Sequence, residues 1–92
     1  MPVLLITYSL KNKTKDYSPF FKAIQKNANG WMHYIDDTWI VNTNLEAEKY
    51  AEKLYPHMLK NDYLLVVKIY NNHQGWLPED AWNWLNDKNL DY

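Results

Sequence analysis

Trp31-Met-His-Tyr-Ile-Asp-Asp-Thr-Trp-Ile-Val-Asn-Thr43 is the stretch that decides the fold, because it predicts two strands joined by a tight turn. Aspartate tolerates the left-handed conformations that two-residue hairpin turns require, which places Asp36 and Asp37 at the turn. Side chains alternate between the two faces of a strand, so the register fixes which residues share a face. Counting outward from the turn pairs Ile35 with Thr38, Tyr34 with Trp39, His33 with Ile40, Met32 with Val41 and Trp31 with Asn42.

Regular secondary structure is predicted on both sides of this hairpin. The nearly continuous apolar run in residues 3–9 predicts a strand. Ser18 followed by Pro19 predicts a helix with Ser18 as its N-cap, ending near Asn29-Gly30. After the hairpin, Thr43 and Glu46 match a capping box for a second helix, which Pro56 ends or kinks. The clearest strand follows at residues 63–70, and Leu77-Pro78 begins a short last helix.

The order of these elements predicts the architecture. Two β-α-β units joined by a hairpin form the split βαβ arrangement, so we expect an α+β, ferredoxin-like βαββαβ sandwich with an added short C-terminal helix. Right-handed crossovers then place the first and third strands side by side at the centre of the sheet. We expect one domain over residues 1–92, with the βαββαβ core in residues 1–70 and a C-terminal arm and helix in residues 71–92.

Composition narrows the class of protein. There is no cysteine, which excludes disulfides and thiolate metal sites and fits a reducing cytoplasm. The longest apolar run near the start is too short for a membrane span or a signal peptide. All 10 basic residues are lysine and the formal net charge is −1, which lowers the expectation of nucleic-acid binding without excluding it. Abundant lysine and asparagine without arginine suggest an AT-rich genome, such as that of a phage or an AT-rich bacterium.

The sheet face that the two helices leave uncovered is predicted to be too apolar to face water, which indicates an interface. A symmetric homodimer through this open face or through an edge strand is the simplest resolution. Trp82 and Trp84 are two positions apart on a helix, so one surface cannot bury both. The C-terminal segment is therefore either a lid on its own core or an arm on a second subunit. The residues expected at a dimer interface are His33, Ile35, Ile40, Leu64, Val66, Trp76, Trp82 and Trp84.

Several polar side chains are predicted to meet at one end of the sheet. Ser9, the Asp36-Asp37 turn and Asp62 all come to this end in the predicted topology, either as turn and capping residues or as contacts to a ligand or Mg²⁺. His33 is either a general base or a hydrogen-bonded interface residue. The lysines of the polar loop, Lys11, Lys13 and Lys15, are either solvated or steer phosphates beside the rings of Tyr8 and Tyr17.

Three stretches carry a resemblance to a known family: Leu4-Leu-Ile-Thr-Tyr-Ser9, the hairpin Trp31–Val41, and Gly75-Trp-Leu-Pro78 with Ala81-Trp-Asn-Trp84. Together they resemble small bacterial and phage proteins labelled SinR-like, over nearly the whole chain. That group is remotely similar to the small ferredoxin-like subunit of CRISPR adaptation and to virulence-associated protein D. The resemblance implies a homodimer that binds or cuts nucleic acid with an aspartate at the end of its first strand. Ser9, or at most its neighbour Tyr8, occupies the matching place here, and serine lacks the charge of a metal-binding carboxylate.

These observations predict a cytoplasmic, homodimeric and non-catalytic binding protein without a cofactor. Its expected ligand is nucleic acid, a nucleotide or a host protein, contacted through Tyr8, Ser9, His33, Asp36 and Asp37. One alternative is a Mg²⁺-dependent nuclease of low activity, like the CRISPR adaptation subunit. Another is a phage-type inhibitor that binds a host protein. No Gly-rich phosphate loop, Ser/His/Asp grouping or HExxH motif is present.

Overall fold

The computed structural model describes residues 1–90 and shows the expected α+β, ferredoxin-like fold. Four antiparallel strands form one sheet in the order β2-β3-β1-β4, so the first and third strands are adjacent at the centre, as predicted. Residues 91 and 92, the end of the predicted C-terminal arm, lie outside the described residues. The elements are β1 (Val3–Ser9), α1 (Ser18–Lys26), β2 (Gly30–Ile35), β3 (Thr38–Asn42), α2 (Ala47–Leu54), a 3₁₀ turn (Tyr55–His57), β4 (Tyr63–Lys68) and α3 (Glu79–Asn86).

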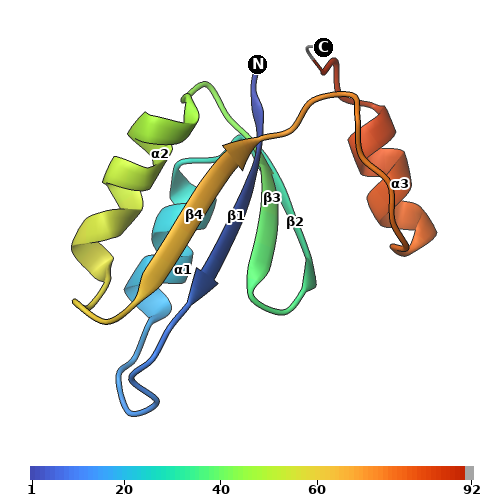
Figure 1. Cartoon of the computed structure of the whole chain (residues 1–92). Helices are drawn as coiled ribbons and strands as arrows, with labels where there is room; N and C mark the ends of the chain where they lie inside the picture. Colours follow the sequence, from blue (N-terminus) through green and yellow to red (C-terminus); the bar gives the residue numbers. More distant parts are fainter. Residues whose placement is uncertain (91–92) are drawn as a thin grey trace.

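Helices α1 and α2 cover one face of the sheet, and the main core lies between them and the strands (Figure 1). Alternate residues of β1 point into this core, namely Leu4, Ile6 and Tyr8. Helix α1 contributes Phe20 and Ile24, and α2 contributes Tyr50 and Leu54. The 3₁₀ turn follows α2 at Pro56, where the sequence predicts that the helix ends or kinks.

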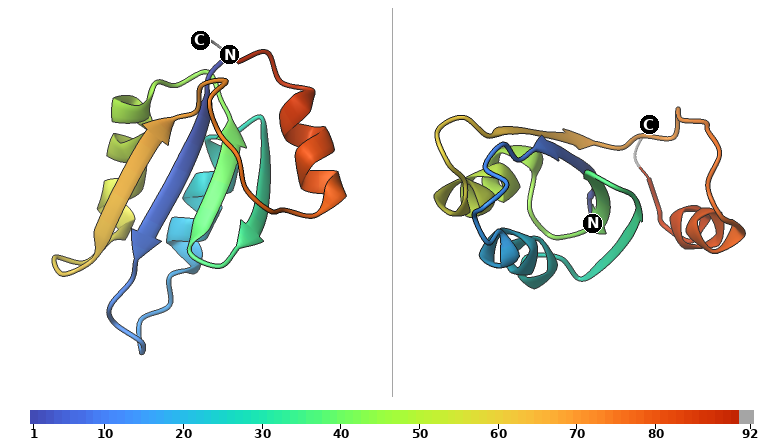
Figure 2. Two further views of the ribbon diagram at one scale, coloured as in Figure 1. Left: turned by 45° about the vertical axis from the view of Figure 1, so that its right-hand side comes forward. Right: turned by 90° about the horizontal axis from the view of Figure 1, so that it is seen from below.

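Helix α3 packs on the opposite face of the sheet of its own chain, the arrangement expected of a lid (Figures 1 and 2). Its buried residues Ala81 and Leu85 form a second cluster with Val3, Met32 and Ile40. Both Trp82 and Trp84 are partly buried against that cluster. The lid covers β2, β3 and the start of β1, so the open face is exposed along β4. None of the helices in residues 1–90 is long and apolar enough to cross a membrane.

The predicted hairpin register holds only next to the turn. Ile35 pairs with Thr38 as expected, but an irregularity between Met32 and Ile35 shifts the rest of the hairpin by one residue. Met32 therefore pairs with Ile40, and Trp31 pairs with Val41. A shift of one residue exchanges the two faces of a strand. Met32 consequently faces α3, while Trp31 lies on the helix-covered side, where its ring is 5.0 Å from that of Trp39.

The predicted position of Leu64 and Val66 on the open face is wrong. Both side chains pack against the main core on the helix-covered face. The open face of β4 carries Tyr63, Leu65 and Val67 instead, which are 68%, 58% and 39% exposed. All the apolar positions of this strand look alike in the sequence, so the sequence does not show which face of the strand a helix covers. In the structure α2 covers the face that carries the even-numbered residues.

Two predicted helix caps are also wrong. Helix α1 begins at Ser18 itself, and the Asp16 carboxylate accepts hydrogen bonds from the Ser18 backbone N–H and hydroxyl. Thr43 does not cap α2, which begins at Ala47. The Thr43 side chain is buried and bridges two segments instead. Its hydroxyl donates to the Asn27 carbonyl and accepts from the Leu45 backbone N–H.

Candidate functional site

The ends of three strands meet at one end of the sheet, as the topology predicts. Ser9, the last residue of β1, is paired with Tyr63 at the start of β4. On the other side of β1, the Asp37 carbonyl accepts hydrogen bonds from the Tyr8 backbone N–H and the Thr7 hydroxyl. Ser9, the Asp36-Asp37 turn and Asp62 therefore lie along one rim of the sheet.

Two of the residues predicted to contact a ligand, Tyr8 and His33, make contacts within the fold instead. The Tyr8 ring is buried, and its hydroxyl accepts a hydrogen bond of 2.9 Å from the Trp39 indole N–H. Burial raises the pKa of Tyr8, and the nearby Asp37 charge adds to this, although the Trp39 bond opposes it. His33 stacks on Trp39 at 4.0 Å, and its Nε2 lies 2.7 Å from the Asp36 carbonyl oxygen. Because Trp39 belongs to the main core, His33 lies on the helix-covered side and not on the open face as predicted.

Asp62 is a buried structural anchor. Its carboxylate accepts hydrogen bonds of 2.8 Å from the backbone N–H groups of Lys11 and Leu59, and the Tyr17 hydroxyl donates to both oxygens. Burial alone raises the pKa of this carboxyl, but the hydrogen bonds to Lys11, Leu59 and Tyr17 outweigh burial and hold the pKa below its usual value. These contacts favour a structural role for Asp62, because a metal ion would compete for carboxylate oxygens that already accept hydrogen bonds.

A basic hollow of about 580 Å³ lies directly outside Asp62. It is lined by the loop after β1 and by the turn before β4, which bring Lys11 and Lys13 beside Lys60. All three lysines are exposed, and they outnumber the single carboxylate in the wall, that of Asp62. Lys15, the third lysine of the predicted cluster, instead lies over the Tyr17 ring. The hollow therefore collects positive charge at the rim of the sheet.

Tyr63 supplies an exposed aromatic ring beside Lys11, one of the lysines that line this hollow. The Lys11 Nζ lies 5.2 Å from the centre of the Tyr63 ring. Sequence reasoning assigned the stacking role to Tyr8 and Tyr17, but both rings are buried. The prediction from the sequence did not include Tyr63 or Lys60 among the ligand-binding residues. The signal that could have found Tyr63 is its position at the first residue of a strand, where a bulky ring can project past the end of the sheet.

Carboxylates suitable for a metal ion are sparse in the described part of the chain. Within residues 1–90 no group of three or more His, Asp or Glu side chains is placed so that it could hold a metal. Asp36 and Asp37 are exposed at the hairpin turn. Ser9, which occupies the end of β1, offers a hydroxyl rather than a charged ligand.

Trp76 is the most exposed aromatic residue of the described chain. It is 96% exposed in the loop between β4 and α3. Beside it, an apolar hollow of about 220 Å³ lies between this loop and the open face and is lined by Leu5, Ile35, Ile40 and Trp82. The predicted interface residues Ile35, Ile40, Trp76 and Trp82 thus lie near one another, whereas Leu64 and Val66 lie on the other face.

Comparison of this chain with family models, curated proteins and solved structures found no match.

Proposed function

We propose that the protein is a small, non-catalytic binding protein whose ligand is single-stranded nucleic acid or a nucleotide. The observation that carries the proposal is the combination of the lysine-lined hollow with the exposed Tyr63 ring, which lies against Lys11. Lysines attract phosphates, and aromatic rings stack on bases with little regard to sequence. The ligand site thus moves from Tyr8 and His33 to the rim formed by Ser9, Lys11, Lys13, Lys60 and Tyr63.

Binding without cleavage follows from the chemistry of the same rim. A phosphodiester cleaved with Mg²⁺ needs carboxylates that hold the metal and neutralise developing charge. Asp62 is the carboxylate nearest the lysines, and its oxygens are committed to Tyr17 and to two backbone N–H groups. Ser9 supplies no charge. The exposed Asp36-Asp37 turn lies on the far side of β1 and repels phosphate, which directs the ligand toward the lysine side.

The positive charge of the hollow can be tested by reversing it. The double substitution Lys11→Glu and Lys13→Glu is expected to weaken binding of a fluorescein-labelled oligothymidylate at least about tenfold and to reduce the salt dependence of binding. Fluorescence anisotropy at several salt concentrations measures both effects. The matched control is Lys22→Glu with Lys26→Glu, which makes the same charge change on the exposed side of α1. Equal losses in the two double variants would show that only net charge matters and would overturn the hollow as a site.

The stacking role of Tyr63 makes a separate prediction. Tyr63→Ala is expected to weaken oligothymidylate binding by about five- to 150-fold, since loss of one base–aromatic stack costs about 1–3 kcal/mol. The salt dependence should stay unchanged because no charge is removed. Tyr34→Ala removes an exposed tyrosine from the hairpin and serves as the control. Unchanged affinity in Tyr63→Ala would exclude stacking on this ring.

A second candidate function is the inhibition of a host protein, and the observation that favours it is Trp76. An exposed tryptophan beside an apolar hollow is typical of a binding hot spot. This candidate is distinguished from nucleic-acid binding by capturing proteins from host lysate with the wild-type protein and, in parallel, with a Trp76→Ala variant. A stoichiometric partner that only the wild type retains, together with no oligonucleotide binding, would favour inhibition over nucleic-acid binding.

A further inference from the structure

The outer edge of β4 has backbone groups that face away from the sheet. The Ile69 backbone N–H donates to the Val3 carbonyl at 2.8 Å, which fixes the hydrogen-bonding phase of the β1–β4 ladder. In an antiparallel pair such bonding alternates along the strand, so Val67 and Leu65 also face β1. The N–H and C=O groups of Leu64 and Val66 therefore point to the outer side. In the described part of the chain, β4 pairs with β1 alone, and no further strand covers this side.

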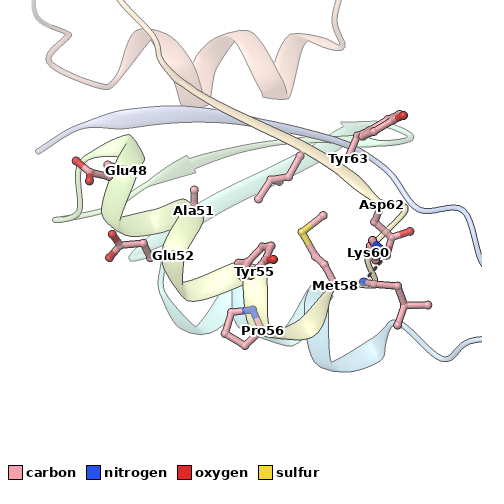
Figure 3. A pocket seen from close by; sticks show the side chains of 11 residues that line it. Glu48, Ala51, Glu52, Tyr55, Pro56, Met58, Lys60, Asp62 and Tyr63 are labelled. Carbon is pink, nitrogen blue, oxygen red and sulfur yellow. Dashed lines mark hydrogen bonds between the residues drawn. The ribbon is translucent and has the colours of Figure 1, made fainter.

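A groove of about 970 Å³ runs beside this edge, between β4 and α2 (Figure 3). Its walls are partly apolar, with Ala51, Met58 and Leu64 along the floor and the exposed Tyr55 at the rim. An edge strand with an apolar surface invites pairing with another chain, and proteins usually block it with proline, bulges or several charges. β4 contains no proline and a single charged residue, Lys68.

Charge is distributed unevenly along the groove. Glu48 and Glu52 lie at the end where α2 begins, and Lys60 lies at the opposite end, near Tyr63 (Figure 3). The contact of 3.7 Å between Lys68 and Glu46 places the start of α2 beside the end of β4. The groove thus runs from an acidic end to a basic end, parallel to the edge strand.

We propose that the occupant of this edge is a second copy of the chain, paired antiparallel through β4 about a two-fold axis at Leu65. A two-fold axis reverses the direction of the strand, so the acidic end of each groove meets the Lys60 end of the other. Leu64 and Val66 of the two copies together supply about four backbone hydrogen bonds across the axis. The two four-stranded sheets become one continuous sheet.

The pairing also explains the exposed side chains of β4. Leu65 and Val67, which are 58% and 39% exposed in one chain, become the centre of an apolar stripe that continues across both copies. Such cross-strand pairs of apolar residues are the usual source of stability between paired strands. The proposal does not depend on nucleic-acid binding, because it rests on the backbone phase of β4 and on the groove.

The test uses the full chain and a substitution at Val66, whose backbone N–H faces the outer side of β4. Val66→Pro removes the outward N–H, and proline is tolerated in an edge strand when its nitrogen faces away from the ladder. Val66→Ala shortens the same side chain but keeps the N–H and is the matched control. Light scattering is expected to give twice the 11.1 kDa chain mass for wild type and Val66→Ala, and the mass of one chain for Val66→Pro.

A second measurement keeps the test decisive if Val66→Pro fails to fold. Amide hydrogen exchange of the wild type at two protein concentrations should show slower exchange at Leu64 and Val66 when the protein is concentrated, while exchange in α1 is unchanged. A monomeric wild type, a Val66→Pro variant that stays dimeric, or exchange at Leu64 and Val66 that ignores concentration would each overturn the proposal. A dimer that survives Val66→Pro would point to the open face around Trp76 instead. Loss of the dimer with retained oligothymidylate binding would leave the proposed ligand site standing.

Discussion

Replacing Tyr50 by alanine is expected to lower the free energy of unfolding by about 4 kcal/mol, the largest effect of any substitution considered for this chain. The Tyr50 side chain is 0% exposed and lies in the main core between α2, α1 and the sheet. Removing its ring leaves a cavity that the rigid strands cannot fill. Chemical denaturation followed by tryptophan fluorescence measures the loss.

The Tyr50 hydroxyl has a role distinct from that of the ring. It donates a hydrogen bond to the carbonyl of Ile24, which lies in the last turn of α1, where carbonyl groups lack partners within the helix. Burial raises the pKa of Tyr50 strongly, so the hydroxyl keeps its proton. Tyr50→Phe is therefore expected to cost about 1–2 kcal/mol, clearly less than Tyr50→Ala. Equal losses in both variants would mean that the hydroxyl, and not packing, dominates at this position.

The fold was predictable because several weak signals agreed. The hairpin turn at Asp36-Asp37, the proline at the start of α1 and the strand beginning at Tyr63 together allowed one order of elements, and the structure has that order. The register along the hairpin was not predictable, because nothing in the sequence marks the irregularity between Met32 and Ile35, after which Met32 lies in the α3 cluster. Turn chemistry fixes pairing only next to the turn, and tertiary contacts decide the rest.

The candidate site was predictable in location but not in its residues. Strand direction brought Ser9, the aspartate turn and Asp62 to one rim, as expected. Exposure could not be inferred, because Tyr8, Tyr17 and Tyr63 are the same residue type, and only packing shows that the first two are buried. The same limit applies to Leu64 and Val66, which are apolar like their neighbours but lie under α2.

Replacing Asp62 by alanine is expected to destabilise the protein by about 3 kcal/mol at neutral pH, because two backbone N–H groups and the Tyr17 hydroxyl lose their acceptor together. These bonds tie the loop after β1 and the turn before β4 to one carboxylate. The lysine hollow is built from the same loop and turn, so the variant should also weaken oligothymidylate binding. Asp62→Asn, which keeps the shape and one acceptor oxygen, is expected to lose less of both properties. Equal destabilisation by the two variants would show that the charge of Asp62 is essential.

The stabilisation of the fold by the Asp62 carboxylate should disappear in acid. Its pKa lies below its usual value in the folded protein, so the unfolded chain takes up the proton first as the pH falls. The stabilisation is therefore complete above the unfolded pKa of about 4 and is lost as the pH falls through the lower folded pKa. Urea unfolding of wild type and Asp62→Asn from pH 7 to pH 3 measures this directly, and the gap between their unfolding free energies should narrow below about pH 4. A gap that stays constant over this range would show that Asp62 stabilises the fold by packing and not through its charged hydrogen bonds.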